Sequence, residues 1–159
     1  MAGEERNLIP KVQIKDVKKI YEGRNGQTIA LNGANLDIYD NEFICVVGPS
    51  GCGKSTLLNI IAGLHEATSG EVLVDGVKVE GTGVDRGVVF QQYALFPWRT
   101  VLKNVMFPLE MKKTPKEEAE KIAMKYIKAV GLEGFENSYP KELSGGMKQR
   151  VAIARAYAA

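Results

Sequence analysis

The chain has 159 residues, and its 45% hydrophobic and 25% charged content is ordinary for a soluble globular domain with a substantial core. A formal net charge of +2 is too small to indicate binding of nucleic acid or of a membrane surface. No apolar run approaches the roughly 20 residues of a membrane-spanning helix, and from the polar first residues we expect no secretory signal peptide. Cys45 and Cys52 lie in and just before one loop, so we expect no structural disulfide and a cytosolic protein.

The first half of the chain predicts a mixed β-sheet. Asp75-Gly76 is a strong signal for the tight turn of a hairpin, and the alternation of the second strand is interrupted near Asn32-Gly33. Residues 43–47 and 87–90 are short apolar runs, which indicates buried strands. The predicted strands cover residues 12–17, 28–38 and 43–47, a hairpin at 71–79, and residues 87–90.

Residues 48–55, GPSGCGKS, fill every fixed position of the phosphate-loop pattern G-x-x-x-x-G-K-[ST]. The loop follows the predicted strand 43–47 and precedes residues 56–63, which predict a helix ended by a glycine. This strand–loop–helix context is what the motif requires, and the alternative, a glycine-rich turn that only joins strand to helix, does not explain it. The candidate phosphate-binding residues are Gly48, Pro49, Ser50, Gly51, Cys52, Gly53, Lys54, Ser55 and Thr56.

The chemistry of this loop follows from its residue types. Glycines let the backbone wrap closely around phosphate oxygens, and the N-terminus of the following helix directs free N–H groups toward the anion. Lys54 is expected to reach the β- and γ-phosphates, and the Ser55 hydroxyl to bind Mg²⁺. Cys52 lies at a helix N-terminus that favours a thiolate, although we interpret it as a small filler beside the phosphates. Alkylation of Cys52 is expected to block nucleotide binding.

The second half of the chain predicts helices. Thr114 is expected to cap a helix with Pro115 at its first position and Glu117 completing a capping box, and Gly131 is expected to end it. A last helix is expected from about Gly146 to the C-terminus. The packing side of the first of these helices comprises Ala119, Ile122, Ala123, Tyr126, Ile127 and Val130, and that of the second Val151, Ala154 and Ala158.

A second glycine-rich motif, residues 143–150 or LSGGMKQR, lies about ninety residues after the phosphate loop. It predicts another anion site, because a serine can cap the helix and two glycines allow close approach of the backbone. A plain N-capped helix is the alternative, and the phosphate loop in the same chain favours the anion site. The candidate residues are Leu143, Ser144, Gly145, Gly146, Met147, Lys148 and Gln149.

Together the two motifs identify a family resemblance. LSGGMKQR resembles the signature motif of ATP-binding cassette (ABC) ATPases, and GPSGCGKST resembles their Walker A loop. The resemblance implies an α/β P-loop NTPase fold of the ABC type, with a mixed β-sheet, a P-loop core and a helical subdomain. The chain resembles the N-terminal two-thirds of such a domain, with a β-subdomain and P-loop part at 1–91, a helical subdomain at 92–145 and a signature helix at 146–159. It also implies a head-to-tail homodimer in which the signature of one copy closes on ATP held by the other.

Single positions carry further expectations from the resemblance. Tyr21 matches the aromatic residue that stacks on adenine, which is chemically sensible because every base has a π-face. Gln91 matches the Q-loop glutamine, which contacts Mg²⁺ and the attacking water, so Lys54 and Gln91 are the expected catalytic residues and Ser55 and Gln91 the expected metal ligands. An ordinary strand tyrosine and a polar residue at a strand end are the alternatives. His65, the single histidine, is expected on the surface and does not match the switch histidine of the family.

The segment after Gln91 predicts a partner surface. Residues 93–101, YALFPWRTV, place aromatic side chains around a proline, which is typical of a core or of a docking surface. In ABC importers this region receives the transmembrane permease subunit, so residues 91–105 are the expected permease contact. The sequence most resembles cassettes of nitrate, sulfonate and taurine importers. A cytoplasmic subunit bound through its permease to the inner face of the cell membrane is therefore expected, with no nucleic acid partner.

The family's Walker B strand, an apolar run that ends in Asp and is followed by a catalytic Glu, is not found in the 159 residues. Phosphoryl transfer needs a positioned metal ion and an oriented water, so we expect this chain to be a fragment with negligible ATP turnover. The missing strands are expected to expose long apolar sheet edges. Two alternatives remain: a non-catalytic nucleotide-binding or interaction module, and a soluble ABC ATPase without a transport role, as in DNA repair or translation. Small-molecule kinases and GTPases do not explain the LSGG helix.

Overall fold

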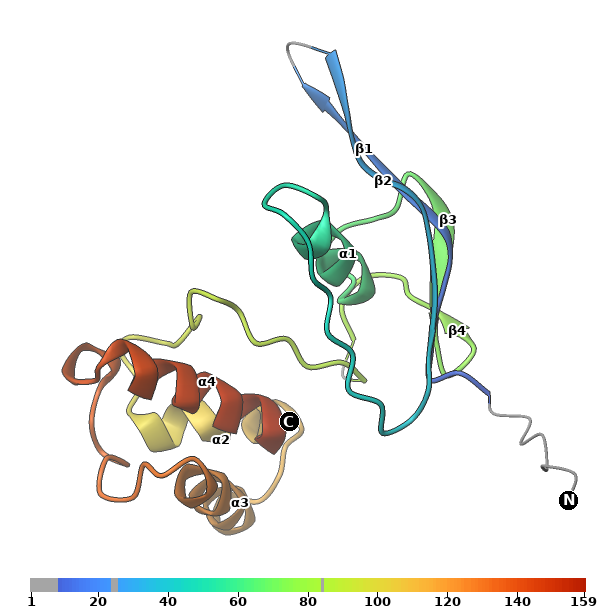
Figure 1. The fold of residues 1–159 in the computed structure, drawn as a ribbon. Helices are drawn as coiled ribbons and strands as arrows, with labels where there is room; N and C mark the ends of the chain where they lie inside the picture. The colour runs from blue at the N-terminus through green and yellow to red at the C-terminus, as the bar shows by residue number, and fades with distance from the viewer. Residues whose placement is uncertain (1–8, 24–25, 84) are drawn as a thin grey trace, which may run out of the picture. The chain divides into compact units, whose positions relative to one another are not determined.

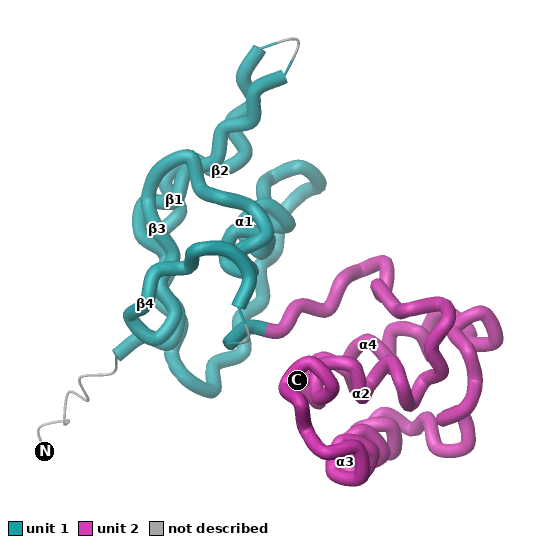
Figure 2. Tube along the Cα trace, turned by 180° about the vertical axis from the view of Figure 1, so that it is seen from behind, with its two compact units in different colours: residues 1–86 teal, residues 87–159 magenta. Residues whose placement is uncertain are grey.

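The computed structural model describes residues 9–23, 26–83 and 85–159. The chain forms two compact units, residues 1–86 and residues 87–159, and each has a core of its own (Figure 2). The first unit packs around Ile14, Val17, Ile60 and Val72, and the second around a larger cluster that includes Val105, Ile127 and Val151. The phosphate loop lies in the first unit and the signature motif in the second.

The first unit is a four-stranded antiparallel sheet with one helix beside it (Figure 1). The strands lie in the order β2-β1-β3-β4, and the helix contributes Ile60 to the core between it and the sheet. The elements are β1 (Val12–Gly23), β2 (Gly26–Ile38), α1 (Lys54–Ile61), β3 (Ser69–Val74) and β4 (Val77–Lys78).

The sheet confirms the predicted N-terminal strands and the hairpin. Asp75 and Gly76 both have positive φ angles, 50° and 77°, which is the geometry that a two-residue hairpin turn requires. The expected interruption of the second strand is present, because the pairing register of β1 with β2 shifts on either side of Ala34 and Gly33 has a φ of 84°. The predicted strands are shorter than β1 and β2, because the alternation of apolar and polar residues becomes irregular beyond a shift in the pairing register.

Two predicted strands are wrong for this chain. Residues 43–47 and 87–90 form no strand, and their side chains are exposed rather than buried. The exposed fraction is 94% for Phe43, 83% for Val47 and 41% for Phe90. A strand exists only when a neighbour satisfies its backbone groups, and in the described part of the chain no strand pairs with either run. Both runs are apolar, but a run forms a strand only when a neighbouring strand pairs with it.

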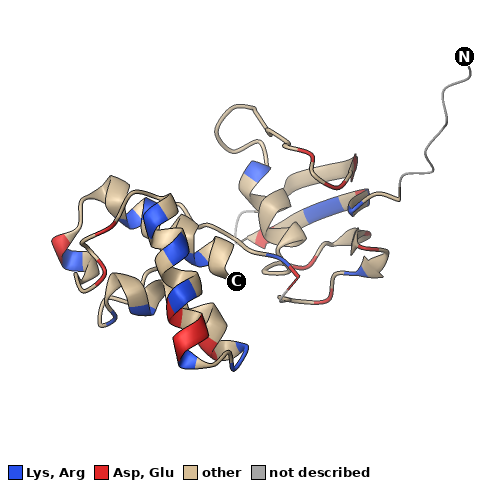
Figure 3. Cartoon of the chain, turned by 90° about the horizontal axis from the view of Figure 1, so that it is seen from below, with Lys and Arg blue, Asp and Glu red and all other residues tan. Residues whose placement is uncertain are grey.

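The second unit is helical. Its elements are α2 (Val101–Met111), α3 (Lys116–Ala129), the short 3₁₀ helix η1 (Pro140–Glu142) and α4 (Gly145–Ala158). The helices bury the predicted apolar faces, with Ala119, Ala123 and Ile127 of α3 against Val151 and Ala154 of α4. Figure 3 marks basic and acidic positions along the helices of this unit, and α3 has acidic residues in its first turn and Lys128 in its last. That order of charges favours the helix dipole.

The predicted start of α3 is wrong, while its predicted end is confirmed. Thr114 does not cap α3, because its N–H bonds to the carbonyl of Leu109 and so closes the end of α2. Pro115 therefore takes the N-cap position, with no side-chain cap, and α3 begins one residue later than expected. At the other end Gly131, with a φ of 67°, places its N–H and that of Leu132 on the last turn of α3, as a Schellman motif does.

Candidate functional site

The phosphate loop lies directly before α1, and two of its glycines have left-handed backbone angles. Gly51 has a φ of 80° and Gly53 a φ of 95°. Gly53 is the N-cap of α1, so the free N–H groups of the first helical turn begin at Lys54. No acidic residue lies in this first turn. The local field at the start of α1 therefore favours an anion.

Lys54 closes the loop on itself. Its ammonium donates hydrogen bonds to the carbonyl oxygens of Gly48, at 2.8 Å, and Pro49, at 2.7 Å, and lies 3.5 Å from the sulfur of Cys52. The positive charge is thus held within the loop, beside the helix N-terminus. Ser55, the next residue, is exposed in the first turn of α1.

Gly53 also fixes the loop against the sheet. A Cβ at this position would overlap the carbonyl oxygen of Ala30 and lie 2.9 Å from Cδ2 of Leu31, both in β2. Only a glycine allows α1 to begin this close to the strand. From the sequence, a glycine here is expected because the backbone must approach phosphate closely. The structure gives a second reason, because the loop packs directly on the sheet at this residue.

Tyr21 lies in β1, opposite Thr28 of β2, and its side chain is 38% exposed. Its hydroxyl is 3.2 Å from Nδ1 of His65, and the two rings meet edge to face with centroids 6.3 Å apart. The ammonium of Lys19 lies 5.1 Å from the centre of the Tyr21 ring. His65 is exposed, as predicted, but its contact with Tyr21 was not predicted, because no local pattern joins residues 44 positions apart.

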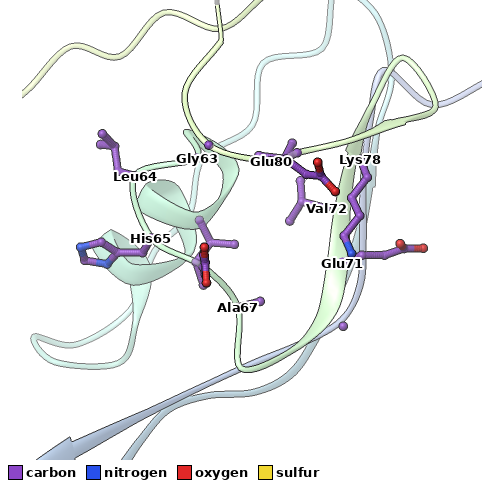
Figure 4. A pocket seen from close by; sticks show the side chains of 13 residues that line it. Gly63, Leu64, His65, Ala67, Glu71, Val72, Lys78 and Glu80 are labelled. Atoms are coloured by element: carbon purple, nitrogen blue, oxygen red, sulfur yellow. The ribbon is translucent and has the colours of Figure 1, made fainter.

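A cavity of about 550 Å³ lies between the end of α1 and the β3–β4 hairpin (Figure 4). Glu71, Val72 and Lys78 line the strand side, and the chain that follows α1 lines the other. Figure 4 shows the imidazole of His65 directed away from that strand side. His65 lies in the chain that lines the cavity on the side of α1.

The signature motif begins α4 as expected. Ser144 is the N-cap, and its hydroxyl accepts a hydrogen bond of 3.3 Å from the N–H of Met147. Leu143 is buried, while Gly145 and Gly146 are exposed at the start of the helix. A Cβ on Gly145 would lie 3.1 Å from the hydroxyl of Tyr93, so this glycine also accommodates a neighbouring side chain. This geometry is compatible with both interpretations of the motif, a plain capped helix and an anion site. Lys148 and Gln149 follow in the first turns.

Gln91 lies in an exposed turn, and two residues with unusual backbone angles follow it. Tyr93 and Ala94 both have left-handed φ angles, 59° and 46°, although neither is a glycine. The guanidinium of Arg155, in α4, donates hydrogen bonds of 3.3 Å to the carbonyl of Tyr93 and 2.8 Å to that of Ala94. Burial lowers the pKa of Arg155 from its ordinary value. The segment after Gln91 is therefore held by the signature helix.

The aromatic segment that follows is organised by one buried amide. Asn104, completely buried in α2, accepts a hydrogen bond from the N–H of Phe96 and donates to the carbonyls of Phe96, Arg99 and Thr100. Trp98 remains 72% exposed at the tip of this segment. Trp98 thus has the exposure that a docking surface requires, while Tyr93 and Phe96 are half-buried. Asn104 was not singled out from the sequence, although a lone asparagine between Val101 and Val105 on an apolar face was a usable signal.

The predicted site residues thus divide between the two units. Unit 1 brings together residues 48–56, and it places Tyr21 beside His65 beyond the other end of α1. Unit 2 holds Gln91 and residues 143–149. In the portions that the structure covers, no three His, Cys, Asp or Glu side chains group as metal ligands would, and Cys45 and Cys52 are free. Each described helix falls short of the length or apolar character that crossing a bilayer requires.

Comparison with known proteins gives close matches. The ABC transporter family profile matches residues 31–159. An uncharacterised ABC transporter ATP-binding protein of Methanocaldococcus jannaschii is 61% identical over 148 residues, which is 93% of this chain and 55% of that protein. The nitrate import ATP-binding protein NrtD of Synechocystis is 51% identical over 92% of this chain and 55% of its own length. The chain thus spans about half the length of these curated relatives.

Solved structures agree with the fold. A structure described as a dimeric bacterial ABC transporter cassette superimposes with a TM-score of 0.85 at 42% identity, covering 92% of this chain and 69% of the other. A post-hydrolysis cassette bound to ADP and phosphate gives a TM-score of 0.84 at 43% identity over the same shares. These matches confirm the P-loop ABC fold class expected from the two motifs. The chain belongs to the ABC transporter family of ATP-binding proteins.

Proposed function

We propose that the chain is the nucleotide-binding part of the ATP-hydrolysing subunit of an ABC importer, which couples ATP binding and hydrolysis to solute transport. The observation that carries the proposal is the ammonium of Lys54, held within the glycine loop at the N-terminus of α1. A phosphate chain that enters the loop takes over this charge from the carbonyls of Gly48 and Pro49, and meets the free N–H groups of the helix.

ATP and Mg²⁺ are the proposed ligands of this site. Tyr21 offers its ring to the adenine, and Lys54 contacts the β- and γ-phosphates. The exposed hydroxyl of Ser55 suits Mg²⁺, which prefers oxygen ligands and commonly takes only one or two from the protein. Gln91 is the other proposed metal ligand and is proposed to orient the attacking water. When bound, Mg²⁺ neutralises charge on the phosphates.

Two kinds of partner are proposed. A second copy supplies residues 143–149 to the triphosphate held by the first, so that a two-fold axis completes two composite sites. A transmembrane permease contacts residues 91–105, where Trp98 is exposed, and holds the subunit at the inner face of the cell membrane. An anion such as nitrate or a sulfonate is the proposed cargo class. The names of relatives support it, since one is a nitrate importer subunit and another, 44% identical, an aliphatic sulfonate importer subunit of Bacillus cereus.

Calorimetric titration of the purified chain with ATP and with AMP tests the nucleotide site. ATP is expected to bind at least about tenfold more tightly than AMP, because the loop contacts the phosphates that AMP lacks. Equal affinity for the two nucleotides would remove the basis of the proposal. A photo-crosslinker placed at position 98 of the chain tests the partner surface, and the expected product is a membrane-spanning protein.

A second function is favoured by one feature of the sequence. The 159 residues contain no apolar run that ends in Asp-Glu, so the chain by itself is proposed to bind nucleotide without hydrolysing it. Phosphate release from ATP measures this directly. Steady turnover by the purified chain, abolished by Lys54→Ala, would contradict this second function and show that the chain itself hydrolyses ATP.

A further inference from the structure

We propose that His65 is a positioning residue for the base of the bound nucleotide, acting through the hydroxyl of Tyr21. This inference rests on the proposed function, since it concerns the same ATP site. It adds a residue that neither motif contains, and it concerns the end of the site away from the phosphates.

The contact fixes the orientation of the Tyr21 ring. A tyrosine side chain in a strand rotates about two torsions unless its far end is held. The hydroxyl of Tyr21 lies 3.2 Å from Nδ1 of His65, and the imidazole meets the phenol ring at an interplanar angle of 80°. Lys19 lies over the ring, with its ammonium 5.1 Å from the ring centre. One face of the ring is thus occupied by a cation, and an adenine can stack on the opposite face.

His65 itself is on an anchored segment. The N–H groups of Leu64 and His65 both bond to the carbonyl of Asn59, in α1. Three residues later, Thr68 receives a hydrogen bond from the N–H of Ile20 and donates its own N–H to the carbonyl of Lys18. The segment is therefore attached to α1 at one end and to β1, beside Tyr21, at the other.

This anchoring connects the two ends of the nucleotide site. α1 begins at Lys54, in the phosphate loop, and its eight residues span roughly 12 Å before the segment that carries His65. The same helix thus positions the phosphate contacts at its N-terminus and, through His65, the aromatic ring beyond its C-terminus. An adenine on Tyr21 and a triphosphate in the loop are held at a distance that α1 sets.

Titration of the full 159-residue chain with ATP and with inorganic tripolyphosphate tests the proposal. His65→Ala and Tyr21→Phe are each expected to weaken ATP binding about three- to tenfold, the range for one lost hydrogen bond, and to leave tripolyphosphate binding unchanged. The double variant is expected to be no weaker than either single variant, because both remove the same contact. His65→Asn, whose amide oxygen can take the place of Nδ1, is expected to restore part of the affinity. Leu64→Ala, an exposed neighbour, is the control and is expected to bind ATP as the unmodified chain does.

The outcomes separate this inference from the proposed function. Unchanged ATP affinity in His65→Ala and Tyr21→Phe, with Lys54-dependent binding of both ligands intact, overturns the role of His65 and leaves the nucleotide site standing. An equal loss of ATP and tripolyphosphate binding in His65→Ala also overturns it, because that result indicates damage to the unit rather than to the base contact. Absence of binding of either ligand to the unmodified chain overturns both proposals.

Discussion

The ammonium of Lys54 lies 2.8 Å from the carbonyl oxygen of Gly48, six residues earlier in the same loop. The lysine that is proposed to bind phosphate therefore also satisfies the loop's own backbone. We expect a triphosphate that enters the loop to replace these carbonyls as the partner of the Lys54 ammonium. These contacts hold the loop without a ligand, which is expected to lower the entropic cost of ordering it on binding.

Lys54→Ala is expected to weaken ATP binding about 10- to 100-fold, because hydrogen bonds to a charged group are stronger than neutral ones. Calorimetric titration with ATP measures the loss. Lys15→Ala removes an exposed lysine of β1, in the same unit, and serves as the control for net charge. A similar loss in both variants would show that long-range charge, and not the contact in the loop, is responsible.

Gly53→Ala is expected to disrupt the phosphate loop more than Gly51→Ala does. Both glycines have positive φ angles, so an alanine costs about 1–2 kcal/mol at either position. At Gly53 the added methyl group also overlaps the carbonyl of Ala30, whereas at Gly51 it meets nothing within 4 Å. Free energies of unfolding from urea titration, together with ATP affinity, compare the two variants. Equal losses would mean that the packing of the loop on β2 is unimportant.

Alkylation of Cys52 is expected to block ATP binding, because its sulfur lies 3.5 Å from the Lys54 ammonium inside the loop. N-ethylmaleimide treatment of the Cys45→Ala variant leaves Cys52 as the single target. Bound ATP is expected to slow the reaction, and complete modification to lower ATP affinity at least about tenfold through steric exclusion and loss of the lysine contact. Full modification, verified by mass spectrometry, with undiminished affinity is the contrary result.

Asn104→Ala is expected to destabilise the helical unit by about 2–3 kcal/mol, since it leaves the N–H of Phe96 and the carbonyl of Arg99 without their partner. The carbonyls of Phe96 and Thr100 lose one of two donors and keep a backbone N–H. Trp98, the single tryptophan, lies in the affected segment, so its fluorescence during urea unfolding reports the change directly. Lys103→Ala, the exposed neighbour on α2, is expected to remain within about 0.5 kcal/mol of the unmodified chain. A destabilisation by Asn104→Ala as small as that of Lys103→Ala would show that water replaces the amide at little cost.

Local patterns predicted those parts of the fold whose partners lie nearby in the sequence. The turn at Asp75-Gly76 brings β3 and β4 together through two residues, and Gly131 ends α3 by its own backbone angle. Residues 43–47 show the limit of such patterns. Their apolar run indicates a strand, but a strand depends on neighbours that periodicity does not name, and Phe43 is exposed in this chain.

The candidate site follows the same division. The phosphate loop and the capped start of α4 were predictable because a motif contains every residue of each. The partners of Lys54, the contact of Tyr21 with His65 and the support of Phe96 by Asn104 were not predictable, because each depends on three-dimensional packing. The predicted cap at Thr114 is wrong: residues 114–117 fit the capping-box pattern, but the N–H of Thr114 bonds to the carbonyl of Leu109 at the end of α2.

Arg155→Lys is expected to loosen the backbone that follows Gln91. A lysine keeps the charge but cannot bridge the carbonyls of Tyr93 and Ala94 as the planar guanidinium does. These two residues hold left-handed angles that cost energy without such support, so the amides near them are expected to exchange hydrogen faster, with the free energy of unfolding about 1–3 kcal/mol lower.

Arg150→Lys provides a matched control for that variant. Arg150 is also in α4 and donates to two carbonyls, those of Val130 and Gly131, at the end of α3. Its replacement is expected to speed exchange there and not near Tyr93. Hydrogen-exchange mass spectrometry resolves the two regions in one experiment. Protection near Tyr93 that survives Arg155→Lys, or falls equally in both variants, would show that the strained segment after Gln91 is held by the unit as a whole rather than by the signature helix through Arg155.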